Sequence, residues 1–167
     1  MPVLLDHTNR GYSRHFRAAK EPSLYLASLK AARSGRRIVR FTWLRSFHPP
    51  VFVRIEWDNQ GKARLIAKQM SGAGGYDPGV IAKRLDRPLS GNSAHQIESV
   101  IEQTRLFDLP PQECSPYFHV DGADWTVEGV DSRGYHFVIR GSPRNGVVRR
   151  IGDMMLRVTG WKFDPIY

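Results

Sequence analysis

Three side chains in the segment Asp121–Arg144 have the types that acid–base chemistry needs: Glu128, His136 and Arg140. A carboxylate and an imidazole can exchange protons with a substrate, and a guanidinium can hold an anion beside them. Hydrolysis or group transfer also needs a nucleophile, and the segment contains no Ser-His-Asp spacing and no nucleophile elbow. We therefore favour the alternative interpretation, in which these side chains form a cross-strand polar network that fixes a hairpin against the last helix.

Whether Glu128 and His136 meet depends on the register of the hairpin that holds them. If Val130 pairs with Gly134, Glu128 faces His136, whereas pairing of Val130 with Tyr135 separates the two. A slip of one residue turns every side chain of a strand to the other face of the sheet. An enzyme centred on Glu128, His136 and Arg140 therefore requires the first register.

The hydrophobic pattern predicts the elements that must position these residues. Apolar residues alternate with polar ones in several short runs, which is typical of strands with one buried and one solvated face. The connectors between the early runs contain Pro or Gly and fit hairpins, so these runs form an antiparallel meander. The expected order is a helix over 22–35, strands over 37–45, 51–58, 62–69 and 80–89, a helix over 93–106, strands over 124–130 and 135–140, and a helix over 142–160.

The helix boundaries follow from capping residues. Pro22-Ser23 suits a first turn and Gly35 a stop. Ser93–Gln96 matches a capping box, and Ser142-Pro143 can cap and start the last helix, which ends at Gly160.

Three further expectations concern the first helix, the segment before it and the C-terminal tail. Tyr25 and Leu29 form the apolar side of the first helix, with Leu26 beside them. Residues 1–20 show no clean period and are expected as an irregular arm. The aromatic tail, WKFDPIY at 161–167, is expected to pack back onto the body.

Together these elements predict an α+β fold with about three helices in the order α-ββββ-α-ββ-α. Its antiparallel sheet combines a four-stranded meander with a later β-hairpin, and the helices cover one face. The domains expected are the arm, 1–20, and a single α+β domain, 21–167.

Composition places the chain among ordinary globular proteins. It has 167 residues, of which 41% are hydrophobic and 25% charged, and its net charge is +9. The positive charge permits an acidic protein, nucleic acid or anionic lipid as partner. No apolar run is long enough to cross a membrane, no signal-peptide core is present, and a single cysteine, Cys114, fits a reducing compartment. We expect a cytoplasmic protein with no membrane partner.

Basic residues recur on the side of the meander opposite its apolar face, and an aromatic side chain shares that side. Such a surface suits an acidic protein or, as an alternative, single-stranded nucleic acid. The two loops at 47–50 and 72–79 would extend this surface. The partner-binding residues expected are Arg40, Arg45, His48, Phe52, Arg54, Arg64, Lys68 and Tyr76.

The glycine-rich segment Ser71–Gly79 superficially resembles a phosphate loop. It lacks both the G-x-G-x-x-G that opens a helix and the Gly-Lys-Ser/Thr of nucleoside-triphosphate loops. It is therefore a turned connector or a binding loop, with Tyr76 as the contact residue. The six histidines show no metal-binding spacing, so we expect no metal and no cofactor.

Four sequence blocks resemble the recurring blocks of a family of small, uncharacterised bacterial proteins. They are WLRSFHPP (Trp43–Pro50), SGAGGYDPG (Ser71–Gly79), DGADWTVEG (Asp121–Gly129) and YHFVIRGSP (Tyr135–Pro143). The chain departs from the family at two places: it has Gly141 where an aromatic residue is expected before Ser-Pro, and Phe107-Asp108 where Phe-Trp is expected before Leu-Pro. The resemblance implies a fold and no established activity.

Small bacterial α+β proteins of this kind are often immunity proteins or inhibitors that bind a toxin. We therefore expect a non-catalytic binding protein of the immunity type, which engages a toxin or another acidic protein. The alternatives are a nucleic-acid-binding module that uses the basic sheet face and an enzyme centred on Glu128, His136 and Arg140.

Overall fold

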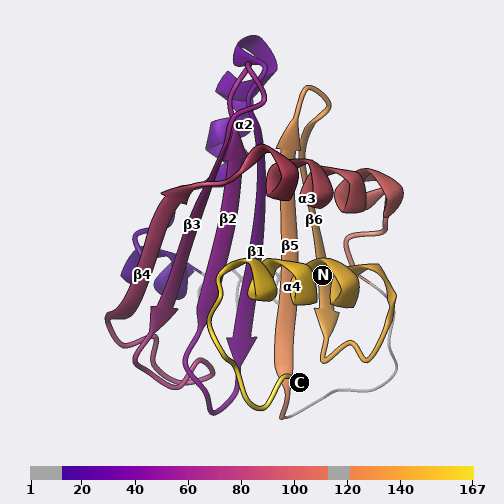
Figure 1. Cartoon of the computed structure of the whole chain (residues 1–167). Helices are drawn as coiled ribbons and strands as arrows, with labels where there is room; N and C mark the ends of the chain where they lie inside the picture. The colour runs from indigo at the N-terminus through magenta and orange to yellow at the C-terminus, as the bar shows by residue number, and fades with distance from the viewer. Residues whose placement is uncertain (1–12, 113–120) are drawn as a thin grey trace.

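The computed structural model describes residues 13–112 and 121–167, which form the predicted α+β fold around one antiparallel sheet (Figure 1). Its elements are a helical turn over 13–18, α2 (Leu24–Ser34), β1 (Arg37–Arg45), β2 (Val51–Trp57), β3 (Ala63–Met70), β4 (Ile81–Pro88), α3 (Gly91–Gln103), the 3-10 helix η1 (Leu106–Asp108), β5 (Ala123–Asp131), β6 (Gly134–Gly141) and α4 (Gly146–Val158). The predicted order α-ββββ-α-ββ-α is confirmed. No helix within the described ranges is long and apolar enough to cross a membrane.

The strands lie in the order β4-β3-β2-β1-β5-β6, and every neighbouring pair is antiparallel. β1 is central because it pairs with β2 of the meander on one side and with β5 of the hairpin on the other. α3 carries the chain from the β4 edge across to the β5–β6 hairpin (Figure 1). The meander and the hairpin are thus two parts of one sheet.

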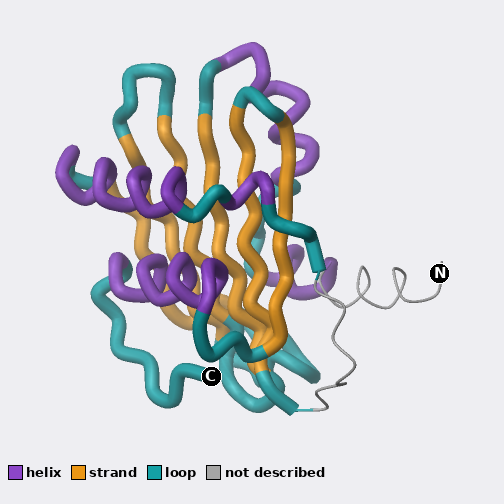
Figure 2. The backbone as a smooth tube through the Cα atoms, turned by 90° about the vertical axis from the view of Figure 1, so that its right-hand side faces the viewer, coloured by secondary structure: helices purple, strands orange, loops and turns teal. Residues whose placement is uncertain are grey.

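Helices cover both faces of this sheet, whereas the sequence pattern predicts them on one face. Figure 2 shows α3 and α4 on one side, with α2 and the helical turn 13–18 on the other. Nearly every residue of β1 and β2 is buried, as expected for strands that are covered on both sides.

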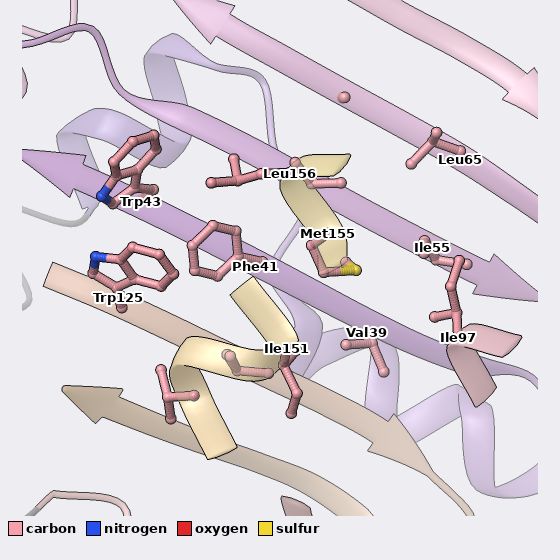
Figure 3. Close-up of a cluster of buried hydrophobic side chains, with 14 of the residues drawn as sticks. Val39, Phe41, Trp43, Ile55, Leu65, Ile97, Trp125, Ile151, Met155 and Leu156 are labelled. Atoms are coloured by element: carbon pink, nitrogen blue, oxygen red, sulfur yellow. The ribbon is translucent and has the colours of Figure 1, made fainter. Parts of the chain in front are cut away.

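The main core lies between the sheet and the helices α3 and α4. Phe41, Trp43 and Trp125 project from β1 and β5 toward Ile151 and Met155 of α4 (Figure 3). The ring centroid of Trp125 lies 5.1 Å from that of Phe41 and 5.6 Å from that of Trp43. All three rings belong to fully buried residues.

The aromatic tail packs against this core, as predicted. The main-chain oxygen of Tyr167 accepts hydrogen bonds from Trp43 Nε1 at 3.0 Å and from Trp125 Nε1 at 2.9 Å. Phe163 meets the ring of Trp43 edge-on at 5.9 Å. The tail therefore satisfies two indole donors that would otherwise be buried without partners.

Two of the predicted helix starts are shifted by three residues. Gly35 ends α2 as predicted, with a φ of 62°. Pro22-Ser23, expected in the first turn, precedes the helix, and the Ser23 hydroxyl caps it. Ser90 caps α3 in place of Ser93, and α4 follows Asn145. Ser142 does not start α4, because its hydroxyl accepts a hydrogen bond from the Ala123 main chain at 2.9 Å.

α2 turns a different side toward the sheet from the one expected. Leu24 packs against Ile38 beneath the helix. Tyr25, Leu26 and Leu29 are 59%, 59% and 62% exposed. The apolar side of this helix therefore faces away from the sheet.

The described part of the predicted N-terminal arm is ordered against the sheet. Residues 13–18 are helical, the ring of Phe16 lies 5.5 Å from that of Phe52, and Ala19 is fully buried. Positions 1–12 and Cys114 lie outside the described residues. The prediction of an irregular arm is thus wrong for residues 13–18.

Candidate functional site

The β5–β6 hairpin adopts the register that separates Glu128 from His136. Val130 pairs with Tyr135, so Gly129 lies opposite His136. The turn is tight, because the Asp131 carboxylate accepts a hydrogen bond from the main-chain N–H two residues later at 2.8 Å. Glu128 and His136 therefore lie on opposite faces of the sheet, and the expected acid–base trio is not formed.

His136 and Arg140 contact the connector that precedes β5. A ring nitrogen of His136, Nε2, lies 2.9 Å from the carbonyl oxygen of Leu109. The guanidinium of Arg140 donates to the carbonyl oxygens of Pro110 at 3.1 Å and Pro111 at 3.3 Å. These contacts hold the connector against β6, which is a structural role.

Glu128 is half of a buried ion pair on the other face of the sheet. Arg40 Nε donates to Glu128 Oε2 at 2.7 Å, and Arg40 Nη2 donates to Oε1 at 2.8 Å. The hydroxyl of Tyr135 donates to the same Oε1 at 3.0 Å. Both charged side chains are buried, so this bidentate contact compensates charges that water does not reach.

Glu21, just ahead of α2, contacts three cations of the same face. Lys68 Nζ donates to Glu21 Oε1 at 2.6 Å. One guanidinium nitrogen of Arg40 and one of Arg54 each lie 3.4 Å from Glu21 Oε2. The Glu21 side chain is only 1% exposed. We call Glu21, Arg40, Arg54, Lys68 and Glu128 the ionic cluster.

Most of the predicted basic face is therefore closed to a partner. Arg40, Phe52, Arg54 and Lys68, predicted to bind a partner, are buried, and residues 16–22 lie against them. Arg64 stays exposed but is paired with a carboxylate of β4 at 2.6 Å. The alternation pattern places these residues on one side correctly and carries no information about the segment that covers them.

Replacement of Tyr135 by Phe is expected to change how stability depends on alkaline pH. Burial, followed by the Glu128 carboxylate, raises the pKa of the Tyr135 hydroxyl above its ordinary value of 10.0. The folded protein thus keeps a proton that the unfolded chain releases, so this stabilising contribution is present below pH 10.0 and declines as the pH rises above it. Urea unfolding between about pH 9 and 11 should show a steeper loss for wild type than for Tyr135→Phe. Equal losses of stability with pH for the two proteins would contradict this prediction. Tyr76→Phe, which changes an exposed tyrosine, is the control.

The loops at 47–50 and 72–79 lie against each other at one end of the sheet. Gly74 N donates to His48 O at 3.0 Å, and Gly75 N donates to Ser46 O at 3.1 Å. A Cβ at Gly74 would lie 2.5 Å from a main-chain oxygen of β1, so only glycine permits this approach. The loops expose Phe47 and Tyr76, which are 57% and 66% exposed with ring centroids 6.1 Å apart.

Arg45 and His48, the other loop residues predicted to bind a partner, are engaged internally. Arg45 is buried with its guanidinium 4.0 Å from the centroid of Trp43, and it donates to Pro49 O at 2.7 Å. Burial lowers the pKa of the Arg45 guanidinium. His48 Nδ1 lies 2.6 Å from the Tyr167 hydroxyl. Of these three predicted loop contacts, Tyr76 is the one whose side chain remains exposed.

A groove that the predictions did not include lies between α3 and α4. Its volume is about 720 Å³. Figure 2 shows the two helices one beside the other on the same face of the sheet. The groove follows α4 from Asn145 to Arg157, and the end of α3 forms the other wall. Its apolar lining comes from Val100, Val147 and Met154. We call this feature the α3–α4 groove.

The charged lining of the groove is mainly basic. Arg149 and Asp153 neutralise each other through an Nε–Oδ2 contact of 2.9 Å. Arg150 donates to the Gln103 amide oxygen at 3.1 Å, and Arg157 is exposed. Neither Arg150 nor Arg157 forms an ion pair among the described residues. The first turn of α4, which carries no acidic residue, adds the positive end of a helix dipole.

The sequence contains part of the signal for this groove. Arg149 and Arg150 are adjacent, and Arg157 follows two helical turns after Arg150. What the sequence does not reveal is that α3 lies alongside α4, because that contact depends on the path of the chain across the sheet.

Within the described ranges, no group of three or more His, Cys, Asp or Glu side chains comes together to hold a metal ion. No known protein-family model and no curated protein matches the chain, so its function is inferred from the geometry of these surfaces.

Proposed function

We propose that this protein is a non-catalytic binding protein whose partner is an acidic protein, and that the partner docks at the α3–α4 groove. The observation that carries the proposal is the unbalanced charge of the groove. Arg150 and Arg157 form no ion pair among the described residues, and Asp153 is already held by Arg149. Negative charge on the partner would speed association and favour the correct orientation.

The type of binding protein that we propose is an immunity protein or inhibitor of a bacterial toxin. The resemblance of four sequence blocks to small bacterial proteins supports this choice by association. Inhibition of this kind needs a stable surface that covers the target and no chemistry of its own. A groove between two helices packed on a sheet is such a surface.

The two alternatives have less support. The open basic face on which nucleic-acid binding depends is absent, because Arg40, Arg54 and Lys68 are buried. Among the described residues, the lining of the α3–α4 groove contains no aromatic side chain on which bases could stack. The enzyme alternative requires Glu128 and His136 to converge, and they lie on opposite faces.

Reversal of the two unpaired groove charges is expected to weaken partner binding. The tagged wild-type protein and the variant Arg150→Glu/Arg157→Glu would each be used to capture proteins from an extract of the producing cells. A protein that only the wild type retains would be purified and titrated by calorimetry. We expect the variant to bind it at least about tenfold more weakly, because attraction becomes repulsion.

The matched control is Arg17→Glu/Lys83→Glu, which changes the net charge equally at exposed positions outside the groove. The control should bind within about threefold of wild type, since distant surface charges act weakly through salt. Equal losses for both variants would show a general charge effect. Retention of nucleic acid in place of an acidic protein would also overturn the proposal.

A further inference from the structure

We infer that the partner inserts an acidic amphipathic helix into the α3–α4 groove; this inference rests on the function proposed above. The inserted helix would lie beside α4 and add a third helix to the layer that covers this face of the sheet. Its apolar side would face the groove lining, and its acidic side chains would meet the two unpaired arginines.

The shape of the groove fits a helix. It follows α4 from Asn145 to Arg157, which is about 18 Å or roughly three helical turns. Both of its walls are helical, and side chains on a helix form ridges and grooves that a second helix can fill. A partner helix of three to four turns would match this length.

The spacing of the lining residues along α4 also fits a helix. Val147 and Met154 are seven residues apart, and so are Arg150 and Arg157. Residues seven apart lie on nearly the same side of a helix, so α4 carries an apolar stripe beside a basic stripe. A partner helix with apolar residues at i, i+3, i+4 and i+7 and acidic residues beside them would complement both stripes. Met154 adds a flexible, polarisable contact that adapts to different apolar side chains.

Other occupants fit the groove less well. An added strand would need a sheet edge, and the edge strands β4 and β6 contribute no residue to the lining. A second copy of this chain would have to supply an acidic helix. Among the described helices, α3 carries Glu98 and Glu102, and both already contact Arg37.

A displayed library of acidic amphipathic peptides tests the inference. Each peptide has 15 positions, with Leu or Ile in an i, i+3, i+4, i+7 stripe and Glu, Asp, Gln or Ala elsewhere. The library is selected against the wild-type protein, and the enriched peptides are synthesised. We expect them to gain helical circular dichroism on binding and to bind Arg150→Glu/Arg157→Glu roughly tenfold more weakly.

Variants of the apolar lining test whether the peptides bind in the groove. Met154→Gln should weaken the same peptides roughly tenfold, and Val100→Gln tests the opposite wall independently should Met154→Gln prove unstable. Leu29→Gln and Tyr76→Ala remove exposed apolar side chains outside the groove and should leave binding unchanged. Peptides that depend on Leu29 or Tyr76, or that bind without becoming helical, would overturn the inference, and so would a selection that yields no binder.

The outcomes separate this inference from the proposed function. If the purified acidic partner loses affinity for Arg150→Glu/Arg157→Glu while the library yields no helical binder, the proposed function stands and the helix inference fails. If the partner binds this variant as well as it binds wild type, the proposed function fails.

Discussion

Replacement of Glu21 by Gln is expected to lower the free energy of unfolding by about 3–5 kcal/mol. Glu21 is the carboxylate that contacts Arg40, Arg54 and Lys68, and its side chain is 1% exposed. The variant keeps the shape of the side chain but leaves Lys68 with no carboxylate partner among the described residues, while Arg40 keeps Glu128 and Arg54 keeps Glu56. Urea unfolding monitored by tryptophan fluorescence would measure the loss.

The control for this prediction is Glu102→Gln. The Glu102 side chain is 68% exposed and lies 3.7 Å from Arg37, so its removal should change stability by no more than about 0.5 kcal/mol. A loss of less than about 1 kcal/mol for Glu21→Gln would show that water reaches the ionic cluster.

A double-mutant cycle would show that the effect arises within the ionic cluster. Lys68→Met removes one of the buried cations that Glu21 compensates. The combined variant Glu21→Gln/Lys68→Met should therefore be more stable than the sum of the two single losses predicts, by about 0.5–3 kcal/mol. Strict additivity would mean that Glu21 stabilises the fold through other contacts.

Replacement of Gly152 by Ala is expected to destabilise the protein by roughly 3 kcal/mol, although alanine favours helices. A Cβ at Gly152 would overlap the ring of Trp125 and lie 2.9 Å from the ring of Phe41. Trp125 cannot easily move away, because its indole donates to Tyr167 O and Arg149 covers its ring at 4.9 Å. The clash outweighs the gain of about 1 kcal/mol in helix propensity.

Gly91→Ala is the matched control for Gly152→Ala. Gly91 is also in a helix, and a Cβ there would have no neighbour within 4 Å. It should stabilise the protein by about 0.5–1 kcal/mol through helix propensity alone. Thermal unfolding and near-ultraviolet circular dichroism would measure both variants. A neutral result for Gly152→Ala would mean that the rings of Phe41 and Trp125 rearrange at little cost.

The buried ionic cluster and the open α3–α4 groove suit different roles. In the cluster, Glu21 and Glu128 face Arg40, Arg54 and Lys68, and Glu56 lies 3.1 Å from Arg54 beside it. Three carboxylates therefore compensate three cations within the fold. Glu21 thereby connects the N-terminal segment to the sheet, and the cluster leaves little charge for a partner. In the groove, Arg150 and Arg157 have no such compensation among the described residues, which is why we propose that the partner binds there.

The sequence by itself determined the six strands, the helices α2, α3 and α4, and their order, but not the helical turn 13–18 or η1. Period-two alternation predicted the strands because successive side chains in a strand point to opposite faces. Ser23 and Gly35 marked the ends of α2, since a hydroxyl and a left-handed glycine satisfy helix ends locally. These signals act within a few residues, so one sequence is enough to detect them.

Only the tertiary structure decided which of the polar residues are available. The hairpin register separated Glu128 from His136, and alternation alone permits both registers. Glu21 reaches Lys68 across 47 positions of sequence, and no local pattern encodes that contact. The groove residues Arg150 and Arg157 became a surface because α3 lies beside α4. Burial and charge compensation depend on contacts between distant segments, and these contacts, more than residue type, separate the buried arginines from the open ones.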